Sequence, residues 1–178
     1  RRAESVTYLN WISERKGSYV NCTFSDLRFG GYHMMCDDYF SAAPDFYQAF
    51  ENCIFQNNVD STGKRIDFKF HTSKSVAGYV KFRNCLYGTS ADLTNVEDLG
   101  GNVVSDDVMF AKDSAAARYA EAPAYSLQSK SPARDKGYGM DWMIGATDLQ
   151  GTNRVCNVVD IGCYEYWPSN NGLLLIFK

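Results

Sequence analysis

The chain has 178 residues and a formal net charge of −3, and 45% of its residues are hydrophobic and 15% aromatic. This length suits one domain with a substantial core, and the lack of a dominant Lys/Arg cluster argues against a nucleic-acid partner. No stretch approaches the roughly 20 apolar residues of a membrane span, and the abundance of Tyr, Phe and Gly favours strands and turns.

A six-residue phrase, aromatic-x-Asn-Cys-x-aromatic, occurs three times, at residues 19–24, 50–55 and 82–87. Its cysteines, Cys22, Cys53 and Cys85, are almost evenly spaced along the chain. A nearly fixed period of this size indicates a repeat architecture in which each unit stacks on its neighbours. Within a copy, the phrase predicts two short strands joined by a bend at the Asn, because Asn tolerates unusual backbone angles.

Stacking the copies in register would place like side chains in columns, with strands ~4.8 Å apart. We expect an Asn ladder in which each side chain bonds the backbone of the next unit, a column of buried thiols from Cys22, Cys53 and Cys85, and two aromatic columns. In-register thiols point the same way, which is poor geometry for a disulfide. Cys156 and Cys163, which are close in the sequence, either pair across a turn or stay free.

Further strand-like segments follow the copies, at residues 32–36, 66–71, 102–104 and 108–110. Gly- and Asn-rich turns separate these segments, at residues 29–31, 57–63 and 97–101. Each unit therefore carries at least two strands and a variable loop, and about three units are visible. Residues 111–125 are the best candidate for a helix, because Asp113 is an N-cap type residue that precedes good helix formers.

A different signature begins after residue 124, with Ser-Pro-Ala-Arg-Asp-Lys-Gly at 131–137, Thr-Asp-Leu-Gln-Gly-Thr-Asn-Arg at 147–154 and Asp-Ile-Gly-Cys-Tyr-Glu at 160–165. These motifs resemble the C-terminal end of right-handed parallel β-helix proteins of the pectate-lyase-like superfamily. More narrowly, they resemble the choice-of-anchor Q group of secreted bacterial surface proteins. Two positions depart from that pattern: Cys163 stands where Ala is usual, and Asp107 stands where Pro is common.

The tail motifs have a structural interpretation in physical terms. Asp148 and Asp160 can cap turns, and Arg154 can pair with Asp160 or Glu165. The end of a stack of repeats exposes an apolar cross-section and strand edges, which a polar cap must cover. We therefore expect the tail to be a cap and not an active site.

Together, the repeat and the resemblance predict an all-β fold, a right-handed parallel β-helix. About three rungs would span residues 1–110, and residues 111–178 would form an irregular C-terminal tail that packs on the β-helix and caps it. Residues 1–5 lead into no apolar segment, so no signal peptide is predicted there. We expect the natural chain to be longer, with further N-terminal rungs of its own before residue 1.

The resemblance implies a secreted or bacterial cell-surface protein that binds and processes a polysaccharide, with acidic glycans as one substrate class. The enzymes it implies are polysaccharide lyases and glycoside hydrolases, some of them Ca²⁺-dependent, and it implies no other cofactor. The alternative is a non-catalytic adhesin or structural surface β-helix module. The sequence leaves open whether the chain is an enzyme, and it favours no metal site, because no Cys/His pair has zinc-ligand spacing.

Candidate site residues occupy outward positions of the predicted strands. Lys69 and His71 share one strand face, and Lys81 and Arg83 form a second outward series on a later strand. Together these four side chains could line a basic groove for the carboxylate of an acidic sugar. The alternative is an ordinary solvated face opposite buried aromatic residues.

Asp37 and Asp38 form the one acidic pair that directly follows a predicted strand of the repeats. Two carboxylates can divide acid and base roles when their environments differ. Adjacent strand residues point to opposite faces, however, which favours a turn or surface role for this pair. Sugar-stacking platforms could come from the aromatic residues Trp11, Tyr32, Tyr39, Tyr47, Tyr79 and Trp142.

Overall fold

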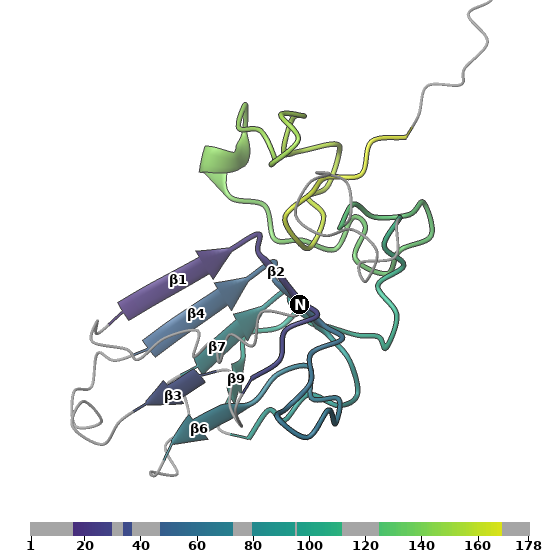
Figure 1. The fold of residues 1–178 in the computed structure, drawn as a ribbon. Helices are drawn as coiled ribbons and strands as arrows, with labels where there is room; N and C mark the ends of the chain where they lie inside the picture. The colour runs from purple at the N-terminus through teal and green to yellow at the C-terminus, as the bar shows by residue number, and fades with distance from the viewer. Residues whose placement is uncertain are drawn as a thin grey trace, which may run out of the picture.

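The computed structural model describes residues 16–29, 34–36, 47–72, 80–94, 96–111 and 125–168. These ranges form an all-β protein with three parallel sheets and no α-helix (Figure 1). A single turn of 3₁₀ helix, η2, covers Asp141–Met143. In the same ranges, no helix is long and apolar enough to cross a membrane. The helix expected at 111–125 lies almost entirely outside the described residues.

The strands are short, and each sheet joins segments that are distant in the sequence. The first sheet has the order β1 (Lys16–Val20), β4 (Tyr47–Glu51), β7 (Val80–Arg83) and β9 (Val96–Asp98). The second sheet has the order β10 (Val103–Val104), β8 (Leu86–Tyr87), β5 (Ile54–Gln56) and β2 (Thr23–Ser25). The third sheet pairs β3 (Met34–Cys36) with β6 (Phe70–Thr72).

The three copies of the phrase stack in register, as predicted. Phe50 pairs with Tyr19 on one side and with Phe82 on the other, and Phe55 pairs with Phe24 and Tyr87. Each copy thus places its first half in the first sheet and its second half in the second sheet.

Both four-stranded sheets contain a further strand that the phrase does not predict. Val96 pairs with Val80 and Val103 pairs with Leu86, so the chain returns to the same sheets after a much shorter connection than the period of the phrase. The segment 97–101, expected to be a turn, therefore starts as strand β9. Parallel pairing does not require a fixed number of residues between paired strands. The three phrases are farther apart in the sequence because the connections from β1 to β4 and from β4 to β7 are longer.

Within each copy of the phrase, the predicted bend at Asn separates the strand in the first sheet from the strand in the second sheet. Asn21, Asn52 and Asn84 have positive φ angles of 53°, 54° and 48°, in the left-handed region that Asn tolerates better than most residues. A second bend follows the second sheet at Asp26 and Asn57, with φ of 58° and 56°. The bend at Asn57 begins the turn expected at residues 57–63, whereas the bend at Asp26 was not predicted. Two turns per repeat therefore redirect the chain around one core.

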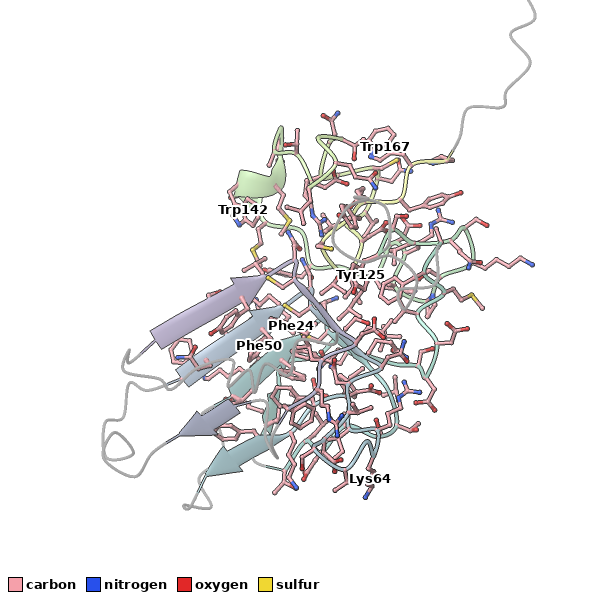
Figure 2. All side chains as sticks on the ribbon, in the orientation of Figure 1. Phe24, Phe50, Lys64, Tyr125, Trp142 and Trp167 are labelled. Atoms are coloured by element: carbon pink, nitrogen blue, oxygen red, sulfur yellow. The ribbon has the colours of Figure 1, made fainter. Side chains whose placement is uncertain are left out.

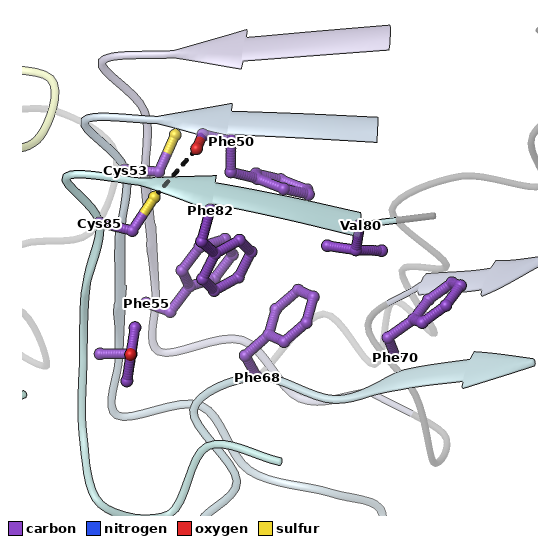
Figure 3. Close-up of a cluster of buried hydrophobic side chains, with 9 residues drawn as sticks. Phe50, Cys53, Phe55, Phe68, Phe70, Val80, Phe82 and Cys85 are labelled. Carbon is purple, nitrogen blue, oxygen red and sulfur yellow. Dashed lines mark hydrogen bonds between the residues drawn. The ribbon is translucent and has the colours of Figure 1, made fainter. Parts of the chain in front are cut away.

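The main core consists of rings and thiols that face inward from all three sheets (Figure 3). Phe55 is fully buried and stacks in parallel on Phe24 and Phe82, with ring centroids 5.0 and 5.2 Å apart. The thiol of Cys53 donates to the Tyr19 carbonyl over 3.3 Å, and burial raises the pKa of Cys53 well above its usual value. The predicted column of buried thiols is confirmed for Cys53 and Cys85, whereas Cys22 packs against the same core but is only partly buried.

The tail packs along the side of the second sheet and makes a second core there. Ile54 and Leu86 point outward from this sheet into a cluster with Leu127, Ala133 and Ile161. Gly162 donates its backbone N–H to the Asn52 carbonyl over 2.8 Å. Figure 1 accordingly shows the green-to-yellow tail lying beyond the arrowheads of β1 and β4.

Candidate functional site

Charged side chains cover the outer face of the first sheet. Side chains alternate along a strand, so Lys81 and Arg83 point outward from β7 while Val80 and Phe82 are buried. In-register pairing places Glu51 beside Arg83 and Glu97 beside Lys81.

Lys81 lies between a carboxylate and a tyrosine ring. Its Nζ is 3.1 Å from Glu97 Oε2 and 5.1 Å from the centre of the Tyr47 ring. The Lys81 side chain keeps 29% of its surface exposed. This ammonium group can therefore still donate to a ligand that approaches from solvent.

Arg83 has an equivalent arrangement two residues further along β7. Its Nη1 lies 3.5 Å from Glu51 Oε1, and its guanidinium carbon is 4.7 Å from the centre of the Tyr138 ring. The Arg83 side chain is 34% exposed. We call Tyr47, Glu51, Lys81, Arg83, Glu97 and Tyr138 the tyrosine–cation face.

The Asn column fixes Tyr138 beside this face. Asn52 accepts from the Tyr138 N–H over 2.6 Å and donates to the Tyr138 carbonyl over 2.9 Å. Asn84 donates to the Lys136 carbonyl over 2.7 Å. The expected ladder is therefore only partly formed. Asn52 donates to the Asn21 side chain over 3.0 Å. The other side-chain bonds of Asn52 and Asn84 go to the backbone of the tail and not to the backbone of the next repeat.

Lys69 is separated from the tyrosine–cation face. It precedes β6 and lies with its Nζ 3.9 Å from Asp92 Oδ2. The neighbouring Phe68 meets Phe82 in the core, with ring centroids 4.8 Å apart. Because these rings face each other from two sides of the core, Lys69 and Lys81 project away from it in different directions. The structure brings Lys81 and Arg83 together and does not bring Lys69 to them.

The remaining predicted site residues are described in part or not at all. His71 is in β6, where its backbone pairs with that of Met35, and its side chain lies outside the described residues. Asp37 and Asp38 also lie outside them. Trp142 is 57% exposed on η2 (Figure 2), and its indole N–H donates to Met140 Sδ over 3.2 Å.

The sequence interpretation missed three members of the face. Glu51 carried a detectable signal, because it falls at the same position of the phrase as Arg83. Glu97 carried none, because it lies on β9, a strand that the phrase does not predict. Tyr138 carried none, since it reaches the sheet from the non-repeating tail.

The tail contains buried carboxylates that cap backbone amides. Glu165 accepts from the N–H groups of Cys156 and Asp160 over 3.0 and 3.1 Å, and burial raises the pKa of Glu165 to about 7. Arg154 is buried, but it donates to the carbonyls of Asp160 and Gly162. The expected ion pair of Arg154 with Asp160 or Glu165 is not formed: Nη2 donates to the loop carbonyls, and the buried Nε and Nη1 have no hydrogen-bond partner in the described residues. These contacts support the structural interpretation of the tail.

The cysteines of the tail are not bonded to each other. Cys156 and Cys163 are both free thiols, so the second of the two alternatives for this pair applies. Among the residues that the structure describes, no group of three or more His, Cys, Asp or Glu side chains could hold a metal ion. The calcium expectation therefore rests on the sequence resemblance.

Comparison with known proteins leaves the description at the level of structural class. No family model, curated protein or solved structure matches this chain. The class is an all-β protein in which in-register repeats form parallel sheets.

Proposed function

We propose that this chain is a right-handed parallel β-helix from a secreted or bacterial cell-surface protein, and that its tyrosine–cation face binds an acidic polysaccharide. The strand order supports the β-helix, because successive repeats enter the first and second sheets in the same sequence and register. The handedness follows from the strong preference of parallel crossover connections for the right-handed form.

The single observation that carries the binding proposal is the double arrangement on β7, where two partly exposed cations each lie over a tyrosine ring. A guanidinium fork matches the geometry of a uronate carboxylate, and an ammonium group donates to carboxylate or hydroxyl oxygens. Tyrosine rings supply an apolar face with a polar tip, which suits the C–H face and hydroxyl edge of a sugar.

The same geometry favours binding over cleavage. Lys81 and Arg83 each have a carboxylate partner, at 3.1 and 3.5 Å. A cation paired in this way acts as a charged hydrogen-bond donor, whereas a catalytic base must be free to take a proton. We therefore place the non-catalytic adhesin or binding module before the lyase or hydrolase.

Affinity gels that contain polygalacturonate test the binding. Arg83→Ala and Lys81→Ala should each reduce the retardation of the protein, and the loss should shrink with added salt. Lys64→Ala is a matched control, because Lys64 is an exposed lysine on the loop between β5 and β6 and does not belong to the tyrosine–cation face (Figure 2). Equal retardation of all three variants and the parent would overturn the proposal.

Product assays separate binding from processing. The protein is mixed with uronic-acid polysaccharides, with Ca²⁺ or with a chelator, and ultraviolet absorbance and reducing ends are followed. A rise in absorbance identifies a lyase, and reducing ends without that rise identify a hydrolase. Retardation in the gels with neither product supports the binding module.

A further inference from the structure

The two ion pairs of the tyrosine–cation face point in opposite directions across the first sheet. Lys81 pairs with a carboxylate on β9, on one side of β7, where its Nζ lies 3.1 Å from Glu97 Oε2. Arg83 pairs with a carboxylate on β4, on the other side of β7, where its Nη1 lies 3.5 Å from Glu51 Oε1. The two carboxylates therefore lie at opposite corners of the face, with the two cations between them.

The other two corners carry apolar side chains. In-register pairing places Ala49 of β4 beside Lys81, and Ala49 is partly buried. Leu99 directly follows β9 and continues the pairing with β7, because its N–H donates to the Phe82 carbonyl over 2.8 Å. Leu99 therefore lies beside Arg83, and it is 36% exposed.

These apolar corners and the two cations form a line across the face. We call it the Ala49–Leu99 diagonal, and it consists of Ala49, Lys81, Arg83 and Leu99. Both carboxylates that pair with the cations lie on the opposite diagonal. The Asp98 carboxylate is held by the following loop, because its Oδ1 accepts from the Gly100 N–H over 2.7 Å and from the Asn102 amide over 2.6 Å.

Sheet geometry sets the length of this diagonal. Outward neighbours on one strand are about 6.7 Å apart, and adjacent strands are about 4.8 Å apart. The diagonal spans two strand spacings and one outward step, so the Ala49 and Leu99 backbones are about 12 Å apart. A single sugar ring cannot span this distance, whereas a short run of linked sugars can.

The two cations act as separate donors along this line. The Lys81 side chain is 29% exposed and the Arg83 side chain 34% exposed, and each has its own carboxylate and its own tyrosine ring. A chain of anionic sugars is attracted by the cations and repelled by Glu51 and Glu97. The path that meets both cations and avoids both carboxylates is the Ala49–Leu99 diagonal.

We propose that an acidic glycan crosses the face along the Ala49–Leu99 diagonal, as a linear segment in which one sugar carboxylate meets Lys81 and a second meets Arg83. Ala49 and Leu99 determine this specificity, because their apolar side chains keep the path free of negative charge. This inference rests on the proposed glycan binding, and it adds the direction of the bound chain and the size and charge pattern of the ligand.

Substitutions at Leu99 test the path in affinity gels that contain polygalacturonate, where each variant is compared with its own migration without the glycan. Leu99→Glu adds a carboxylate on the path and should weaken binding roughly ten-fold. Leu149→Glu is the matched control, because Leu149 is 74% exposed on a turn of the tail and does not belong to the face. It should bind like the parent.

Lysine at the same positions should have the opposite effect. Leu99→Lys and Ala49→Lys each add an ammonium group on the path and should strengthen binding, whereas Leu149→Lys should leave it unchanged. A gain in affinity cannot come from a loss of folding, so these variants test the path even where Leu99→Glu lowers stability.

Calorimetric titrations with galacturonate and trigalacturonate test the ligand. The trimer reaches both cations, so its affinity for the parent protein should exceed that of the monomer by roughly a hundred-fold. Equal affinities would overturn the requirement for two carboxylates.

The outcomes separate this inference from glycan binding itself. If polygalacturonate retards neither the parent nor any variant, both are overturned. If Arg83→Ala loses retardation but Leu99→Glu and Leu149→Glu are retarded equally, glycan binding stands and the path is wrong.

Discussion

Arg83 lies 3.5 Å from Glu51, a residue one repeat earlier in the chain. The two residues occupy the same register position on β7 and β4. Each is outward because its neighbours along the strand are buried in the aromatic core. The repeat that builds the core therefore also sets the charge pattern of the outer face.

Asn52 should be the most sensitive of the three bend residues. Asn52→Ala loses side-chain bonds to Asn21 and Tyr138 and places Ala at a φ of 54°. Left-handed backbone costs roughly 1–2 kcal/mol for such a residue, and each lost hydrogen bond adds about 1 kcal/mol. We expect Asn52→Ala to lower the free energy of unfolding in urea by ~4–5 kcal/mol.

Asn52→Gly separates the two causes of that loss. Glycine accepts the positive φ without strain, so this variant should lose less stability than Asn52→Ala. Equal losses in the two variants would show that the hydrogen bonds alone account for the effect.

The cysteines should differ in reactivity in the native protein. Cys53 and Cys85 are fully buried, whereas Cys156 is partly exposed. Thiolate is the reactive form, and burial raises the pKa of Cys53 well above its usual value and also raises that of Cys156. Because access then decides the order, we expect iodoacetamide to label Cys156 well before Cys53 or Cys85, as mapped by peptide mass spectrometry. Faster labelling of Cys53 would contradict the thiol column.

The phrase predicted what depends on local backbone preference and on in-register stacking. It correctly placed the bends at Asn21, Asn52 and Asn84 and the buried thiols of Cys53 and Cys85. It missed strand β9, because the return from β7 to β9 is much shorter than the period of the phrase. It also missed Tyr138, whose position depends on hydrogen bonds between the tail and Asn52, which are far apart in the sequence.

Stability should depend on pH through Glu165. Burial raises the pKa of Glu165 from 4.5 to about 7 in the folded protein. The folded state therefore holds this proton more tightly than the unfolded chain does, and the free energy of unfolding should fall as pH rises from about 4.5 to about 7. Urea titrations across this range measure the slope.

Glu165→Gln removes the titrating group and should flatten that slope. It should also lower stability at acidic pH, because an amide cannot accept from both the Cys156 and the Asp160 N–H groups. Glu97→Gln serves as control, since Glu97 lies on the outer face of the first sheet, where it pairs with Lys81 and makes no contact with Glu165. A slope that survives in Glu165→Gln would assign the pH dependence to another group.

Gly88 should tolerate no side chain, because it lies against a buried carboxylate that is paired with a partly exposed arginine. Asp67 is fully buried and lies 3.0 Å from Arg65. A Cβ at Gly88 would overlap Asp67 Oδ2 and come within 2.7 Å of Asp106 Oδ1. Gly88→Ala must therefore displace the Asp67 carboxylate from Arg65, and leaving this buried charge without its partner costs up to ~3 kcal/mol.

Gly139→Ala is the matched control for this substitution, because a Cβ at Gly139 would meet nothing within 4 Å. The same added methyl group should leave the urea midpoint of Gly139→Ala close to that of the parent. Gly88→Ala should shift it strongly downward, and Ser90 should lose its 3.0 Å bond to Asp67. Since Asp67 also accepts from the Asn58 N–H, the damage should extend to the second bend of the repeat. Similar midpoints for the two variants would mean that Asp67 can move aside, and that the ion pair does not hold this bend.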